Sequence, residues 1–141
     1  MIQPSVMRIG EHYTCYNKDE ISSYLALIKK SFQDNNFIIT KRKYEPNKND
    51  AFIKKYELSQ SEIKAILLSI TVEDFCYTML DDQNLTEVLY VFALEKLLWN
   101  PEVDEDEQVL IYIKTCYKNE TGFTVVVSFH EAEYTVEYAF R

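Results

Sequence analysis

The alternation of hydrophobic and polar residues is clearest in two runs between residues 107 and 134. The first run places β-branched side chains at every second position, namely Val109, Ile111, Ile113 and Thr115. The second run, residues 123–130, alternates in the same way, and this period of two is typical of β-strands. Between the runs, residues 119–122 end in a glycine, which tolerates the positive φ of a hairpin turn. The pattern therefore predicts a β-hairpin.

The register of this hairpin can also be predicted. A loop of residues 119–121 places the apolar face of one strand beside the apolar face of the other, whereas a slip of one residue sets it against the polar face. In this register Tyr112 lies opposite Ser128, and His130 lies diagonal to Tyr112. We expect Tyr112, Lys114, Ser128 and His130 to share the less apolar face, which is a candidate place for chemistry.

Helical patterns precede the hairpin. Residues 18–35 carry an apolar stripe with helical spacing, and Asn17 with Glu20 forms a capping pair at its start. The members of the stripe are Ile21, Tyr24, Leu25, Ile28 and Phe32. A capping box of Ser59 and Glu62 opens a second helix that extends to about residue 69. Two shorter helices are expected at residues 50–56 and 71–79.

Further strands are expected at residues 37–43, 86–94 and 134–140, where β-branched and aromatic residues gather. The run at 86–94, TEVLYVFAL, is apolar on both faces, which indicates a central strand. Residues 97–106 are expected to form an acidic loop. Helices followed by strands predict an α+β fold, with the N-terminal helices packed on one face of an antiparallel sheet.

Length and composition fit one globular domain. The chain has 141 residues, 47% of them hydrophobic and 27% charged, which is enough to bury a core. We expect a single domain over residues 1–141, with 1–16 as an irregular N-terminal extension. Three cysteines without CxxC spacing favour reduced thiols. No apolar run is long enough to span a bilayer, so the expected location is the cytoplasm, without membrane contact.

The net charge of −8 is unevenly distributed along the chain. Residues 1–66 carry a net charge of +3 and residues 67–141 carry −11. An anion-binding surface is therefore expected mainly from the first half. Its clustered cations are Lys41, Arg42, Lys43, Lys48, Lys54 and Lys55. The ordinary explanation of such charge runs is a solvated surface without a partner.

Four segments together resemble the MqsR family of bacterial toxins. They are EIKAILLSITVEDFCYTMLDD at residues 62–82, then EVLYVFALEK, VLIYIKT and VVVSFHEAEY. They occur in the family's order, and the likeness covers roughly residues 18–134. Members of this family are small ribonucleases of type II toxin–antitoxin systems with a RelE-like fold. The resemblance implies an endoribonuclease that cleaves mRNA without a metal or other cofactor and that a partner antitoxin protein neutralises.

The resemblance also implies roles for single residues. The family's active-site tyrosine falls on Tyr112, and its late-strand lysine falls on His130. The family's lysine that follows the helical segment falls on Tyr77, and the glutamine of its middle strand falls near Val91. Two polar groups of the family pattern are therefore replaced in this chain.

Metal-free cleavage of RNA needs a base, an acid and a cation near the phosphate. His130, with an ordinary pKa of about 6.5, suits the role of base or acid. We expect Lys114 to stabilise the phosphorane and Tyr112 to orient the substrate or donate a proton. The residues expected to bind RNA are Lys41, Arg42, Lys43 and Tyr77.

Two alternatives stay open. In the first, His130 is a strand-end histidine that is hydrogen-bonded to Glu131 or Glu133, and Tyr112 belongs to the packing of the sheet. In the second, the chain is a catalytically inactive MqsR-like interaction module whose acidic second half faces a basic protein. A metal site built from His130, Glu131 and Glu133 is disfavoured, because adjacent strand residues point to opposite faces.

Overall fold

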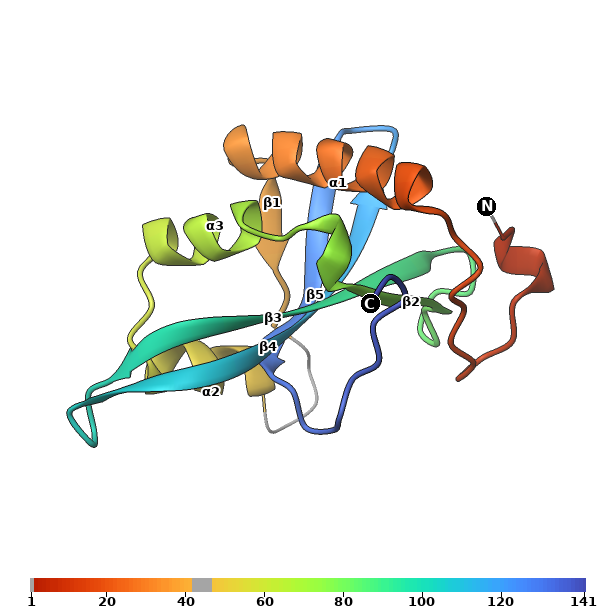
Figure 1. Cartoon of the computed structure of the whole chain (residues 1–141). Helices are drawn as coiled ribbons and strands as arrows, with labels where there is room; N and C mark the ends of the chain where they lie inside the picture. The colour runs from red at the N-terminus through yellow and green to blue at the C-terminus, as the bar shows by residue number, and fades with distance from the viewer. Residues whose placement is uncertain (1, 42–46) are drawn as a thin grey trace.

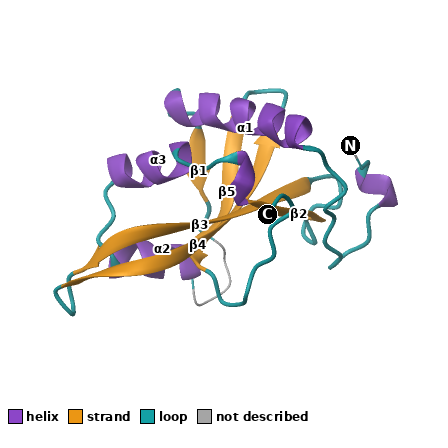
Figure 2. Cartoon of the chain, in the orientation of Figure 1, coloured by secondary structure: helices purple, strands orange, loops and turns teal. Residues whose placement is uncertain are grey.

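The computed structural model describes residues 2–41 and 47–141. Within them three α-helices accompany a five-stranded mixed sheet with the strand order β1-β5-β4-β3-β2 (Figures 1 and 2). The helices are α1 (Lys18–Gln33), α2 (Lys48–Lys55) and α3 (Gln60–Leu68). The strands are β1 (Phe37–Ile39), β2 (Phe75–Leu80), β3 (Val88–Asn100), β4 (Glu105–Lys118) and β5 (Phe123–Glu131). The expected α+β class is confirmed. No helix in the described ranges is both long and apolar enough to cross a membrane.

Helices α1 and α3 begin where their capping residues predict. The Asn17 side chain accepts a hydrogen bond from the backbone N–H of Glu20 at 2.8 Å, and the Glu20 carboxylate accepts one from Asn17 in return. Ser59 and Glu62 form the same box at the start of α3. These bonds satisfy backbone groups that the first helical turn leaves unpaired. At the other end of α1, Asn35 adopts φ = 55°, the left-handed conformation that ends a helix.

The predicted stripe of α1 faces the main core. All five of its members are buried: Ile21, Tyr24, Leu25, Ile28 and Phe32. They pack with residues of α3 and with the aromatic and aliphatic side chains on one face of β3, β4 and β5, including Phe92, Ile111, Ile113 and Phe129. Helices α1 and α3 lie together over this face (Figure 1). The opposite face of the sheet is therefore available for a site.

The sheet is mixed, so the prediction of a purely antiparallel sheet is wrong. Strand β1 pairs with β5 in parallel, with Phe37 beside Thr124 and Ile39 beside Val126. Strand β1 is also shorter than the expected 37–43, whose last two residues lie outside the described ranges. Periodicity identifies a strand but not the direction of its partner, and the chain between β1 and β5 contains α2, α3 and the three other strands.

Helix α2 covers the part of β5 that extends past the end of β1. Asn49 of α2 is buried, and its side-chain oxygen accepts a hydrogen bond from the Phe129 N–H at 2.8 Å. Its side-chain nitrogen donates to the carbonyls of Val127 and Thr40. One amide thus bonds three backbone groups at this strand edge, where the Thr40 hydroxyl also donates to the Val127 carbonyl. Helix α2 starts at Lys48, two residues before the predicted start.

The prediction of a hairpin of β4 and β5 is confirmed, but its predicted register is wrong. Tyr112 lies opposite His130 and Lys114 lies opposite Ser128, because the register shifts between Lys114 and Thr115. The bulge inserts one residue into β5, and the turn places Lys118 opposite Phe123. Alternation along a sequence cannot reveal such an insertion. The prediction that Tyr112, Lys114, Ser128 and His130 share a face is confirmed, since all four line one groove.

Three other element predictions are wrong. The expected helix at 71–79 is a single 3-10 turn, Val72–Asp74, followed by β2. The expected acidic loop at 97–106 is largely strand, because β3 runs to Asn100 and β4 starts at Glu105. The expected strand at 134–140 is irregular. In each case pairing with a distant strand, or its absence, overrides the local preference.

Candidate functional site

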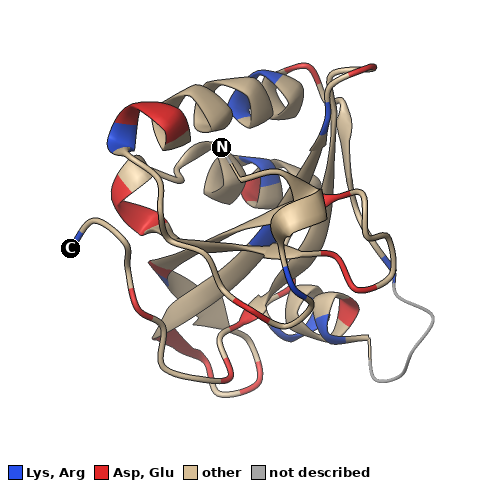
Figure 3. Ribbon diagram, turned by 90° about the vertical axis from the view of Figure 1, so that its right-hand side faces the viewer, with Lys and Arg blue, Asp and Glu red and all other residues tan. Residues whose placement is uncertain are grey.

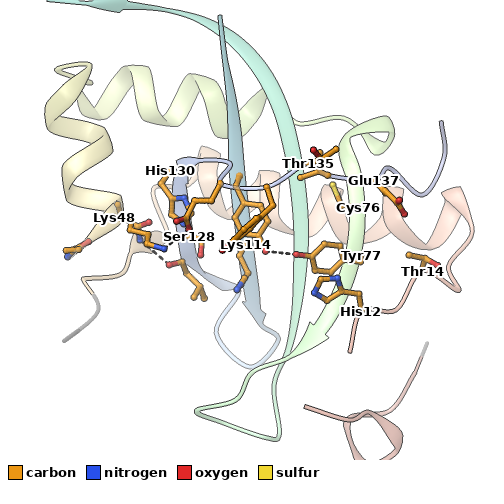
Figure 4. A pocket seen from close by; sticks show the side chains of 17 residues that line it. His12, Thr14, Lys48, Cys76, Tyr77, Lys114, Ser128, His130, Thr135 and Glu137 are labelled. Carbon is orange, nitrogen blue, oxygen red and sulfur yellow. Dashed lines mark hydrogen bonds and ion pairs between the residues drawn. The ribbon is translucent and has the colours of Figure 1, made fainter. Parts of the chain in front are cut away.

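A groove of about 970 Å³ lies on the face of the sheet opposite α1 and α3 (Figure 4). Strands β2, β4 and β5 supply its floor, and the start of α2 and two irregular segments, one near each terminus, contribute to its walls. The polar and aromatic side chains on the floor are Tyr77, Tyr112, Lys114, Ser128 and His130. They alternate with residues that face the main core, such as Ile111 and Ile113. The same strands therefore bury one face in the main core and present the other face to the groove.

Tyr77 and Tyr112 meet above strand β3. Val91 of β3 lies opposite Tyr77, and Ala93 lies opposite Tyr112, so all four residues share one face of the sheet. Val91 and Ala93 are fully buried and small enough to lie beneath the two rings. The two phenol oxygens share a hydrogen bond of 2.7 Å. Burial raises the pKa of Tyr77 above its ordinary value, so this phenol is neutral at physiological pH.

A histidine stacks on each of these tyrosines. The His12 ring lies 3.6 Å from the Tyr77 ring, with an interplanar angle of 8°. The His130 ring lies 5.7 Å from the Tyr112 ring at 25°. His12 reaches the groove because the segment that contains it runs beside β2, where Tyr13 forms a bridge with Thr78. Four rings from three distant parts of the sequence thus form one continuous row, His12–Tyr77–Tyr112–His130.

The positive charge of Lys114 lowers the pKa of both histidines. Its ammonium group lies 5.7 Å from the centre of the Tyr112 ring. Burial lowers the pKa of His12, and the positive charge of Lys114 lowers it further. Burial also lowers the pKa of His130, and the charges of Lys48 and Lys114 lower it further. The hydrogen bond to the Glu131 backbone and the charge of Glu133 oppose the shift. A cation therefore stands close enough to both imidazoles to influence them, and both are mainly neutral at pH 7.

The tautomer of neutral His130 follows from its hydrogen bond. Its Nδ1 lies 2.9 Å from the backbone carbonyl oxygen of Glu131. A carbonyl oxygen can only accept, so Nδ1 carries the proton and Nε2 holds the free lone pair. This arrangement fixes the ring and leaves Nε2 as a base. This bond agrees in part with the expectation that His130 is a strand-end histidine hydrogen-bonded to Glu131 or Glu133.

The walls of the groove carry charges of both signs. Lys48, at the start of α2, forms an ion pair with Glu133 at 2.5 Å. Glu137 also lines the groove. In the view of Figure 3, Lys and Arg residues are interspersed with Asp and Glu residues over the described part of the ribbon. The groove is therefore a mixed site in which lysines and histidines lie beside carboxylates.

The residues expected to bind RNA do not all lie together. Tyr77 lines the groove. Lys41 lines a different hollow, between β1 and helices α2 and α3. Arg42 and Lys43 fall outside the described residues. Of the cationic cluster expected from the first half of the chain, Lys48 is the described member that reaches the groove.

No family model matches this chain, and no curated protein matches its sequence.

Sequence reasoning missed His12. The sequence contains only two histidines, and both line this groove. A chain with only two histidines makes each of them a candidate for acid–base catalysis, in which histidine is the most frequent residue. Their spacing carried no signal, because His12 lies in an irregular segment that the fold brings to β2.

Other reactive groups lie apart from this chemistry. The Cys76 thiol borders the groove but is buried, with its pKa raised to about 12. Cys116 is buried beside Leu89 and Val127, with its pKa raised to about 12 as well. Among the described residues, no three His, Cys, Asp or Glu side chains are placed to hold a metal ion together. Histidines, lysines and phenols are therefore the groups of the groove that suit acid–base chemistry, beside the carboxylates of Glu133 and Glu137.

Proposed function

We propose that this protein is a metal-independent endoribonuclease that cleaves mRNA, the toxin of a type II toxin–antitoxin system. The sequence resemblance to the MqsR family supports this proposal, which includes a RelE-like fold. The single observation that carries it is the placement of both histidines of the chain in one groove, with Lys114 acting on each.

The proposed chemistry begins at His130. Its Nε2 takes the proton from a ribose 2′-hydroxyl, and the resulting oxygen attacks the adjacent phosphorus. Lys114 stabilises the negative charge of the phosphorane. His12 donates a proton to the departing 5′-oxygen, because the bound phosphate raises the pKa of an imidazole that burial and Lys114 otherwise lower. The products are a 2′,3′-cyclic phosphate and a 5′-hydroxyl, so atoms and charges balance without a co-reactant.

The two tyrosines position these groups. Tyr112 contacts the His130 ring and lies below Lys114, while Tyr77 carries the His12 ring. Their shared hydrogen bond fixes the distance between the two halves of the site. By the resemblance, Tyr77 stands where the family has a lysine. In this proposal the imidazole of His12, which stacks on Tyr77, is the protonatable group on that side of the groove.

The test is cleavage of a purified messenger RNA in the presence of EDTA. We expect His130→Ala and His12→Ala each to lower the rate by about 10²–10⁴-fold, the usual contribution of a general acid or base. Lys114→Ala should also slow cleavage. Lys30→Ala is the matched control, since it removes the same charge from an exposed position on α1. Full cleavage by His130→Ala, or loss of wild-type cleavage in EDTA, would contradict the proposal.

A second candidate is a catalytically inactive interaction module. The observation in its favour is the acidic rim, since Glu133 and Glu137 line the groove and the chain carries a net charge of −8. Carboxylates there oppose the phosphate contacts that dominate RNA affinity. Absence of cleavage by the folded wild-type protein, with normal growth of a bacterial host that expresses it, would favour this module.

A further inference from the structure

Strands β3 and β4 extend beyond the rest of the sheet as a two-stranded arm, residues 95–108 (Figure 1). Strand β2 pairs with β3 only as far as Phe92, and β5 pairs with β4 only from Ile111 onward. One face of the arm belongs to the core. Leu98 is buried there, and Tyr56 donates a hydrogen bond to Glu107 at 2.9 Å. This packing holds the arm in place.

The opposite face of the arm is exposed and contains large apolar groups. Leu97 and Trp99 are 64% and 50% exposed. Leu97 lies opposite Gln108 and Trp99 lies opposite Asp106, so their side chains share this face. Glu95 completes it by accepting a hydrogen bond from Gln108 at 3.0 Å. We call these five residues, Glu95, Leu97, Trp99, Asp106 and Gln108, the arm face.

The arm face ends where another segment covers the same side of the sheet. Leu110 follows Gln108 on this side and packs into a cluster with Val136 and Tyr138 of the C-terminal segment. The segment therefore covers Leu110, while Leu97 and Trp99 farther along the arm stay exposed. Exposed apolar groups that adjoin each other on a rigid ribbon are typical of interaction sites.

The charge around these apolar groups is strongly negative. Residues 95–108 contain six acidic residues and one lysine, a net charge of −5 within a chain of −8. The acidic residues are Glu95, Glu102, Asp104, Glu105, Asp106 and Glu107. Such a surface repels nucleic acids and anionic lipid headgroups and attracts cations. An indole face beside a carboxylate suits a guanidinium group, which stacks on the ring and pairs with the carboxylate.

We propose that the arm face binds an arginine-bearing segment of a protein partner. In this complex a guanidinium stacks on Trp99 and pairs with Asp106, while the stem of that side chain or an adjacent apolar residue covers Leu97. The arm face shares no residue with the groove. The inference therefore holds whether or not the groove cleaves RNA.

Trp99 makes the test direct, because it is the only tryptophan in the sequence. An oligoarginine peptide is titrated into the full-length protein at physiological ionic strength while tryptophan emission is recorded, with an oligoglutamate peptide in parallel. We expect a saturable change with oligoarginine alone. Asp106→Asn should weaken binding by about fivefold, the effect expected of one partly exposed ion pair. Leu97→Ser should weaken binding at unchanged charge.

The matched control is Glu120→Gln, which removes one negative charge from the exposed turn at the other end of β4. Binding by this variant should equal that of the wild type. Equal weakening by Asp106→Asn and Glu120→Gln would show that the peptide is attracted only by the net negative charge of the protein, and this would overturn the proposal. So would unchanged emission at saturating peptide. Emission that changes with protein concentration alone, together with sedimentation of a dimer, would instead make a second copy of the chain the occupant.

Asp106→Asn and Leu97→Ser should keep the wild-type unfolding midpoint and the wild-type RNA-cleavage rate. These two readouts separate failure of this proposal from failure of the proposed ribonuclease, since cleavage depends on groove residues that the arm variants leave intact.

Discussion

The phenol oxygens of Tyr77 and Tyr112 lie 2.7 Å apart, although the two residues belong to strands β2 and β4, which β3 separates. The small side chains of Val91 and Ala93 between them make this contact possible. The hydrogen bond joins the half of the groove that holds His12 to the half that holds His130.

This contact predicts energetic coupling between the two tyrosines. Tyr77→Phe and Tyr112→Phe should each lower the free energy of unfolding by about 1 kcal/mol, the net value of one hydrogen bond. The double variant should lose less than the sum of the two, because the shared bond is removed only once. Urea unfolding of the wild type and the three variants measures the coupling. Strict additivity would show that the bond contributes nothing.

The lowered pKa values of both histidines predict an acid-shifted pH profile for RNA cleavage. The base His130 must be neutral, so kcat/KM rises with pH through a pKa below 6.5. The acid His12 must be protonated, so kcat/KM falls again above its own pKa, which is also below 6.5. The maximum should therefore lie below pH 6.5. A plateau that extends to pH 8 would exclude His12 as the acid.

Lys114 contributes to that profile through its charge. Replacing it with Gln removes a positive charge that lowers both pKa values. Both limbs of the kcat/KM profile of Lys114→Gln should therefore shift toward higher pH, along with the loss of rate. The Lys30→Gln variant on α1 should leave both limbs unchanged. A lower rate with unmoved limbs would show that Lys114 acts on the substrate but not on the histidines.

Asn49 should be critical for stability. Asn49→Ala removes the side-chain partner of the Phe129 N–H and one of the two side-chain donors to the Val127 carbonyl, the other being the Thr40 hydroxyl. We expect a loss of about 2–3 kcal/mol in the free energy of unfolding. Asn49→Asp should cost more, because a carboxylate oxygen then faces two carbonyl oxygens. Gln33→Ala, at an exposed position of α1, is the control. Equal unfolding midpoints for all three variants would contradict this role.

The thiols should react at very different rates in the native protein. Cys15 is exposed, whereas Cys76 and Cys116 are buried with pKa values raised to about 12. A thiolate is the reactive form, so an aromatic disulfide reagent should titrate one thiol rapidly in the folded protein and all three in urea. Rapid labelling of Cys15→Ala in the absence of urea would show that the sheet opens around Cys76 or Cys116.

The sequence alone determined the elements whose caps and apolar patterns lie within a few residues of each other. The capping boxes at Asn17 and Ser59 and the stripe from Ile21 to Phe32 act within a few residues, so α1 and α3 follow directly from them. The alternation in β4 likewise fixes which side chains leave the core, which placed Tyr112, Lys114, Ser128 and His130 on one face.

Tertiary structure decided what depends on contacts between distant residues. The parallel pairing of β1 and the strand character of β2 come from partners far along the chain, and the bulge near Lys114 that sets Tyr112 opposite His130 is invisible to periodicity. The presence of His12 in the groove depends on an irregular segment held beside β2. Side-chain direction is a local property of a strand, whereas strand order, register and the meeting of two histidines are properties of the packed chain.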